Sequence, residues 1–92
     1  MAERFHDPIM QQVIKRSIRA SMAEENITYK QLSQSLLGKG VIQSESTLRT
    51  KISTGVMSAS LLMHLLDVLQ VDALPIKQIM TKYGQLKKNS TD

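Results

Sequence analysis

The residues best placed to bind a ligand lie on one side of a short segment, 44–54, which reads SESTLRTKIST. At about 100° per residue in a helix, Leu48 and Ile52 share one face. The opposite face and its flanks carry side chains that donate and accept hydrogen bonds: Gln43, Glu45, Ser46, Thr47, Arg49, Thr50, Ser53 and Thr54. The chemistry of this set is recognition through hydrogen bonds rather than bond making or breaking.

The composition of this face is unusual for a helix that only meets solvent. Such a face is normally rich in Glu, Lys, Arg and Ala, which favour helices. Serine and threonine weaken a helix, but their hydroxyls hydrogen-bond to base edges and to phosphates. We therefore predict a recognition helix for the major groove of double-stranded DNA. The alternative is a polar face with no partner.

Arg49 is expected to make the bidentate contact to guanine, and Glu45 could accept a hydrogen bond from cytosine N4. The predicted base-reading residues are Gln43, Glu45, Ser46, Arg49, Thr50 and Ser53. The predicted phosphate-binding residues are Tyr29, Lys30, Lys39, Ser44, Thr47 and Lys51. Arg16 and Arg19 could also reach phosphate, although a charged face in solvent is the alternative.

The chain lacks the residue patterns of the common enzyme classes. It offers no carboxylate pair, no Ser/His/Asp set and no phosphate-cradling glycine loop, so an enzyme is not expected. There is no cysteine, and neither His6 nor His64 has a second ligand at metal-binding spacing. No metal site and no cofactor are expected.

Length and charge are compatible with one small nucleic-acid-binding domain. The chain has 92 residues and a formal net charge of +4. Residues 26–56 carry Lys30, Lys39, Arg49 and Lys51 against Glu45 alone, so the positive excess falls on the segment with the polar face. The most apolar run, 59–71, is interrupted by polar residues, and no secretory signal is apparent. A cytoplasmic, nucleoid-associated protein is expected.

Capping residues divide the chain into five predicted helices. Asp7 and Pro8 start the first, which runs to about Glu25 with an apolar stripe. Thr28 and Gln31 form a capping box for the second, which ends at about residue 37. Ser44 caps the third and Gly55 closes it. The fourth runs from 59 to about 70 after the Ser58 cap, and its leucines predict burial on more than one side.

The fifth predicted helix follows the Asp72 cap and Pro75 and is stopped by Gly84. The expected domain organisation is a flexible N-terminus at 1–7, a single helical domain at 8–84 and a flexible basic tail at 85–92. In the turn after the second helix, Gly38 and Gly40 are expected to terminate the helix. We expect Leu37, Val41 and Ile42 to point into the core.

The segments ITYKQLSQSL and TLRTKISTG, followed by SASLLMHLLDVLQVD, resemble the Cro/CI-type, or XRE-type, helix-turn-helix family. More narrowly, the Ser-Glu-x-x-Leu-Arg-x-Lys-Ile pattern of residues 44–52 is similar to that of short bacterial domains of unassigned function. The resemblance implies an all-α, compact, five-helix lambda-repressor-like fold with the helix-turn-helix at helices 2 and 3. It also implies that helix 3 reads bases and helix 2 crosses the DNA backbone, usually in a dimer on a palindromic operator. The expected function is therefore transcriptional regulation by operator binding, as repression or activation, with a repressor preferred. Tyr29 stands where the family often has Gln, and the connection to Leu48 is longer than the usual pattern.

A dimer interface is predicted on the fifth helix, where apolar residues recur with helical spacing. These residues are Ile76, Ile79, Met80 and Tyr83. The alternative is that this stripe packs on the first and fourth helices of the same chain. A different functional class also stays open: a small helical protein–protein interaction or adaptor module that does not read DNA.

Overall fold

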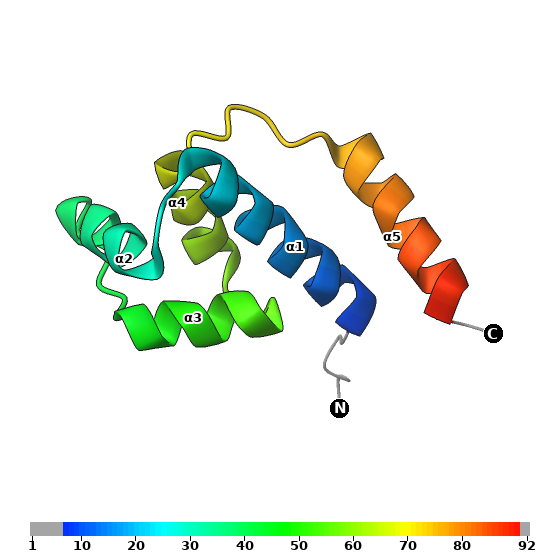
Figure 1. Ribbon diagram of the computed structural model, residues 1–92, viewed down its shortest axis with the longest axis horizontal. Helices are drawn as coiled ribbons and strands as arrows, with labels where there is room; N and C mark the ends of the chain where they lie inside the picture. The colour runs from blue at the N-terminus through cyan, green and yellow to red at the C-terminus, as the bar shows by residue number, and fades with distance from the viewer. Residues whose placement is uncertain (1–6, 91–92) are drawn as a thin grey trace.

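The described residues, 7–90, of the computed structural model fold into five α-helices and contain no strand. In chain order the helices are α1 (Pro8–Glu25), α2 (Tyr29–Gly38), α3 (Glu45–Thr54), α4 (Ala59–Val68) and α5 (Ile76–Ser90). Figure 1 shows α2, α3 and α4 gathered on one side of α1, with α5 alongside α1 on the other side. The all-helical fold class is confirmed.

The starts of α1, α2, α3 and α4 follow the predicted caps. The Asp7 carboxylate accepts from the backbone N–H of Met10 at 3.0 Å, and Pro8 is the first helical residue. Thr28 and Gln31 form the capping box, because each side chain accepts a hydrogen bond from the other residue's backbone N–H. The Ser44 and Ser58 hydroxyls cap α3 and α4 by accepting from the backbone N–H groups of Thr47 and Leu61, without the reciprocal bond of a capping box. These local bonds satisfy N–H groups that a helix start leaves without an intrahelical partner.

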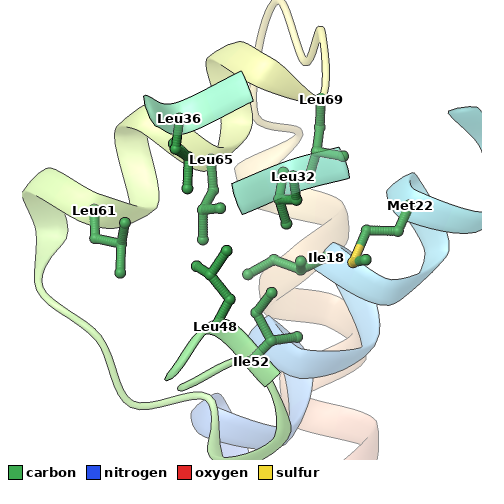
Figure 2. Close-up of a cluster of buried hydrophobic side chains, with 9 residues drawn as sticks. All are labelled: Ile18, Met22, Leu32, Leu36, Leu48, Ile52, Leu61, Leu65 and Leu69. Carbon is green, nitrogen blue, oxygen red and sulfur yellow. The ribbon is translucent and has the colours of Figure 1, made fainter. Parts of the chain in front are cut away.

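One hydrophobic core joins the first four helices, and Figure 2 shows its side chains converging from all of them. The core residues are Ile18, Met22, Leu32, Leu36, Leu48, Ile52, Leu61, Leu65 and Leu69. Leu48 and Ile52 are completely buried, as their spacing predicts. Each fully buried aliphatic side chain of this kind contributes about 1.5–3 kcal/mol relative to an exposed one. Packing therefore holds α3 in place through only two apolar side chains.

The turn between α2 and α3 differs from the sequence prediction. Leu37 is 60% exposed and Ile42 is 79% exposed, so the expectation that both point into the core is wrong. Val41 does pack against the core. Leu37 follows the buried Leu36, and consecutive helical residues point about 100° apart. Gly38 is the last residue of α2, and of the two glycines only Gly40 takes a positive φ, at 81°.

The end of the chain also differs from the prediction. Helix α5 continues through Gly84 to Ser90, so Gly84 does not stop it and residues 85–90 are helical. The expected flexibility of this tail stays a prediction. The helix begins at Ile76, so Asp72 lies too many residues before the helix start to cap it. The expectation of flexibility for residues 1–6 and 91–92 lies outside the described residues.

Helix α5 packs on α1 outside the main core. The Tyr83 hydroxyl donates to the Asp7 carboxylate at 2.9 Å, which joins α5 to the start of α1. Ile79 and Tyr83 are half-buried, whereas Ile76 and Met80 are 56% and 45% exposed. An apolar groove of about 160 Å³ lies between α1, α4 and the start of α5. The apolar stripe predicted as a dimer interface is therefore divided. Ile79 and Tyr83 are partly covered by the rest of the chain, whereas Ile76 and Met80 are open to solvent.

Among residues 7–90, no helix has the length and apolar character needed to cross a membrane.

Candidate functional site

The polar side of α3 is open to solvent along its whole length. Helix α3 begins after the Ser44 cap and ends at Gly55, which adopts a left-handed conformation with φ 69°. The side chains of Ser46, Thr47, Arg49, Thr50 and Thr54 are exposed, and those of Gln43, Glu45, Lys51 and Ser53 are half-buried. The helix therefore presents a continuous row of hydrogen-bonding groups away from the core.

Arg49 lies at the centre of this face and has two partners. Its Nη2 donates to Glu45 Oε2 at 3.0 Å, one helical turn earlier. Its guanidinium carbon lies 5.0 Å from the centroid of the Tyr29 ring, which is within the range of a cation–π interaction. Tyr29 is the first residue of α2, so this contact joins the two helices. The structure thus brings together two predicted base readers and one predicted phosphate contact.

Ser53 is the predicted base reader nearest to α1. The Nη2 of Arg19 donates to the Ser53 hydroxyl oxygen at 3.2 Å. Arg19 is exposed, and it adds a positive charge from α1 to the polar face of α3. The sequence places Arg19 on the polar side of α1, but only the packing of α1 against α3 brings it to this position.

Two predicted contact residues are held by the turn before α3. Lys51 Nζ donates to the side-chain oxygen of Gln43 at 3.1 Å. The hydroxyl of Ser33, in α2, donates to the backbone carbonyl of Gln43. These bonds fix the turn against both helices. The charge of Lys51 therefore lies at the edge of the α3 face, near the end of the inter-helix turn.

Two of the hydroxyls on α3, those of Thr50 and Thr54, donate to carbonyls of the same helix. Thr50 Oγ1 donates to the Ser46 carbonyl at 3.1 Å, and Thr54 Oγ1 donates to the Thr50 carbonyl at 3.0 Å. Ser44 Oγ accepts from the Thr47 backbone N–H at 3.1 Å. A hydroxyl that donates once retains acceptor capacity for a second partner. Thr50 can therefore accept a hydrogen bond from a base amino group without losing its bond to the helix.

The two remaining predicted phosphate contacts have different surroundings. Lys30 is exposed in the first turn of α2 and forms no ion pair with the described residues. Lys39 instead forms an ion pair with Asp67 of α4. The pKa of the Asp67 carboxyl is lowered by this hydrogen bond and by the lysine charge. Lys30 is thus available to a ligand, whereas Lys39 would have to leave its partner.

The sequence of residues 10–74 matches the family described as a domain of unknown function (DUF6471). The chain belongs to this family. No curated protein and no solved structure matches the chain. The DUF6471 match covers α2, α3, α4 and nearly all of α1, and it ends before α5. The polar face of α3 and the residues that flank it in α1 and α2 therefore belong to the domain that defines the family.

No group of three or more His, Asp or Glu side chains within residues 7–90 is arranged to hold a metal ion. What this face can do chemically is form hydrogen bonds and ion pairs with a partner that has a matching pattern of donors and acceptors.

Proposed function

We propose that the chain is a sequence-specific double-stranded DNA-binding protein that represses transcription. In this proposal α2, the following turn and α3 form a lambda-repressor-like helix-turn-helix of the Cro/CI type. Helix α3 enters the major groove, while the start of α2 contacts the phosphate backbone. Two copies bind the two halves of a palindromic operator and block access of the transcription machinery. The protein performs no bond chemistry.

One observation carries this proposal: a buried apolar pair holds α3, and its outer face consists of exposed Ser, Thr and Arg side chains. Leu48 and Ile52 provide all the fully buried apolar packing of α3, so the core of the domain does not depend on the residues of the outer face. Ser and Thr are poorer helix formers than Ala, Lys or Glu by some tenths of a kcal/mol each. Their presence on this face is explained if they bind base edges and phosphates.

The charges around α3 have the sign that DNA binding needs. Lys30 lies at the start of α2, where the helix dipole and free N–H groups also favour phosphate. Arg19 and Arg49 approach the α3 face from α1 and from α3 itself. DNA presents one negative charge about every 1.7 Å along its axis, so a cluster of this sign supplies affinity that does not depend on sequence.

Dimerisation through α5 belongs to the same proposal. Ile76 and Met80 are exposed on α5, and Ile79 and Tyr83 lie beside them. A second copy that covers this surface would bury it in the manner of a twofold interface. Two recognition helices would then read half-sites about 34 Å apart, one turn of DNA.

The test is selection of bound duplexes from a random pool, followed by titration of the preferred site. We expect an inverted repeat to be enriched. Lys30→Ala should weaken binding to all sequences and lower the slope of log affinity against log salt by about 1. Lys77→Ala provides the control because Lys77 is an exposed cation on α5, away from α3, and it should leave the slope unchanged. Selection that enriches no sequence would refute sequence-specific reading.

A second function, as a protein–protein adaptor, is favoured by the apolar groove between α1, α4 and α5. Its lining is almost entirely apolar and includes Val13, Leu62, Leu66, Ile76 and Ile79. A partner helix with an apolar face would fit such a groove. A chain that binds no duplex in the selection experiment, but whose groove binds an amphipathic peptide, would favour this function over DNA reading.

A further inference from the structure

We propose that Glu45 and Arg49 read DNA as one unit supported by the Tyr29 ring. Their target would be a guanine and a cytosine within one base-pair step of each other. This inference rests on the proposed DNA-binding function and deepens it, because it names the base element recognised by the centre of α3. It also gives Tyr29 a positioning role in place of the phosphate contact predicted from sequence.

The three side chains form a compact arrangement that spans two helices. The Arg49–Glu45 ion pair measures 3.0 Å between Nη2 and Oε2, and the Tyr29 ring lies 5.0 Å from the guanidinium carbon. The Arg49 side chain is 56% exposed and that of Glu45 is 43% exposed. The guanidinium is therefore supported on one side by the ring and on another by the carboxylate, while its remaining edge is open.

Both partners retain the groups needed to bind bases. A guanidinium has five N–H donors, and within the described residues Arg49 uses only Nη2. Its other N–H groups can donate to the O6 and N7 atoms of guanine. Glu45 receives Arg49 on Oε2, and its Oε1 has no partner among the described residues. Oε1 can therefore accept from the N4 amino group of cytosine.

The ends of the two side chains are adjacent. Arg49 Nη2 and Glu45 Oε2 lie 3.0 Å apart, although the two residues are a full helical turn apart. Successive bases along a DNA strand are separated by about 3.4 Å. One guanidinium and one carboxylate that stay in contact can therefore meet a guanine and a cytosine of the same or of adjacent base pairs.

The ion pair also explains how an acidic residue is tolerated at a DNA-binding surface. A lone carboxylate in the groove would be repelled by the phosphates on either side. The positive charge of Arg49 offsets that of Glu45, and the pair together matches the acceptors of guanine and the donor of cytosine. A base pair that lacks either group leaves one member of the unit without a partner, which lowers affinity.

The test uses the sequence enriched by selection and duplexes in which each base pair is changed singly, with affinity measured by fluorescence anisotropy. Arg49→Ala should lower guanine discrimination at one position by roughly 5- to 150-fold. As the mark of a coupled unit, Glu45→Ala should abolish cytosine preference and also lower guanine discrimination at the Arg49 position. Independent readers would give additive losses of discrimination in the Glu45→Ala/Arg49→Ala double variant, at one base pair or at two, and that result would overturn the proposal.

Tyr29 supplies a matched pair of variants. Tyr29→Phe keeps the ring and should retain guanine discrimination, whereas Tyr29→Leu removes the ring and should lower it. If the Tyr29 hydroxyl instead binds phosphate, Tyr29→Phe should weaken binding to all duplexes equally, which would overturn the positioning role. Circular dichroism of each variant verifies that the total helix content is unchanged.

The two proposals fail in distinguishable ways. An enriched motif with no guanine or cytosine at the positions sensitive to Arg49 overturns the paired reading and leaves DNA binding intact. A chain that binds no duplex from the pool overturns the proposed function and, with it, this inference.

Discussion

Gly55→Ala should destabilise the fold more than the same substitution at any of the other glycines. Gly55 ends α3 with φ 69°, a conformation that costs an L-residue about 1–2 kcal/mol. A Cβ built there would lie 2.1 Å from the Gln11 carbonyl oxygen and 2.7 Å from the Gln11 carbonyl carbon. These atoms belong to the backbone of α1 and cannot rotate away, so α3 would have to shift.

The clash adds to the conformational cost. Overpacking of a well-packed site costs about 1–3 kcal/mol, so Gly55→Ala should lose about 2–5 kcal/mol of unfolding free energy. For a domain of this size each kcal/mol shifts the thermal midpoint by roughly 4–8 °C. We therefore expect a midpoint at least about 8 °C lower, measured by circular dichroism during heating.

Substitutions at two other glycines separate the conformational cost from the cost of the steric clash. Gly40 has φ 81° but nothing within 4 Å of its Cβ position, so Gly40→Ala reports the conformational cost alone. Gly84 is helical and exposed with open space around it, so Gly84→Ala should stabilise the helix by up to about 1 kcal/mol. If Gly55→Ala loses no more than Gly40→Ala, then α3 does not approach the α1 backbone as closely as described.

Three further predictions concern the core, a cap and a titrating group. Leu36→Ala should cost about 2–5 kcal/mol of unfolding free energy because Leu36 is fully buried, whereas Leu37→Ala should cost little; urea unfolding compares them. Thr28→Ala removes the α2 cap and should cost about 0.5–2 kcal/mol, measured in the same assay. The pKa of the Asp7 carboxyl is lowered by hydrogen bonds from the Met10 N–H and from the Tyr83 hydroxyl. The stabilisation from Asp7 is therefore present above its unfolded pKa of about 3.9 and is lost as pH falls through the lower folded value. Asp7→Asn should flatten that acid loss in thermal midpoints recorded between about pH 2 and 7.

The helix starts could be predicted from sequence because the bonds that set them are local. The hydrogen bond between Thr28 and Gln31 spans three residues, as does that between Ser58 and Leu61. A pattern of residue types at fixed spacing is then sufficient. The same holds for the burial of Leu48 and Ile52, because a four-residue repeat places both on one face and no competing apolar residue lies on the other.

The failures arise where distant residues decide the outcome. Ile42 is as apolar as its neighbour Val41, and only the path of the turn over the core determines which of them is covered. Lys39 pairs with Asp67, which lies 28 residues further along the chain. The glycine pattern predicts that α5 stops at Gly84, but one glycine costs a helix only about 1 kcal/mol. The packing of α5 on α1 can offset that cost.

The candidate site has the same division between local and distant determinants. The polar face of α3 follows from helical periodicity, which places the predicted base readers on it, except Gln43, which lies in the turn before the Ser44 cap. The contact of Arg49 with Tyr29 does not follow from it, because it depends on how α2 packs against α3. Arg19 reaches Ser53 for the corresponding reason, through the packing of α1 on α3.

Helix α3 contains both a source of stability and a source of weakness, and the two lie on opposite sides. Leu48 and Ile52 are completely buried, while Thr50 and Thr54 bond back to their own helix, an arrangement that slightly destabilises and often bends helices. Ten residues are too few for an isolated helix to be stable in water, so α3 depends on its buried side and on the Ser44 and Gly55 caps. The outer face adds no buried apolar side chain, and apart from the Ser53 contact with Arg19 and the Thr54 hydrogen bond from the Val56 N–H, folding alone gives little reason for its hydroxyls. A partner that accepts and donates hydrogen bonds along this face would explain them. This difference between the two sides of α3 is the strongest physical argument for the proposal that α3 binds a partner.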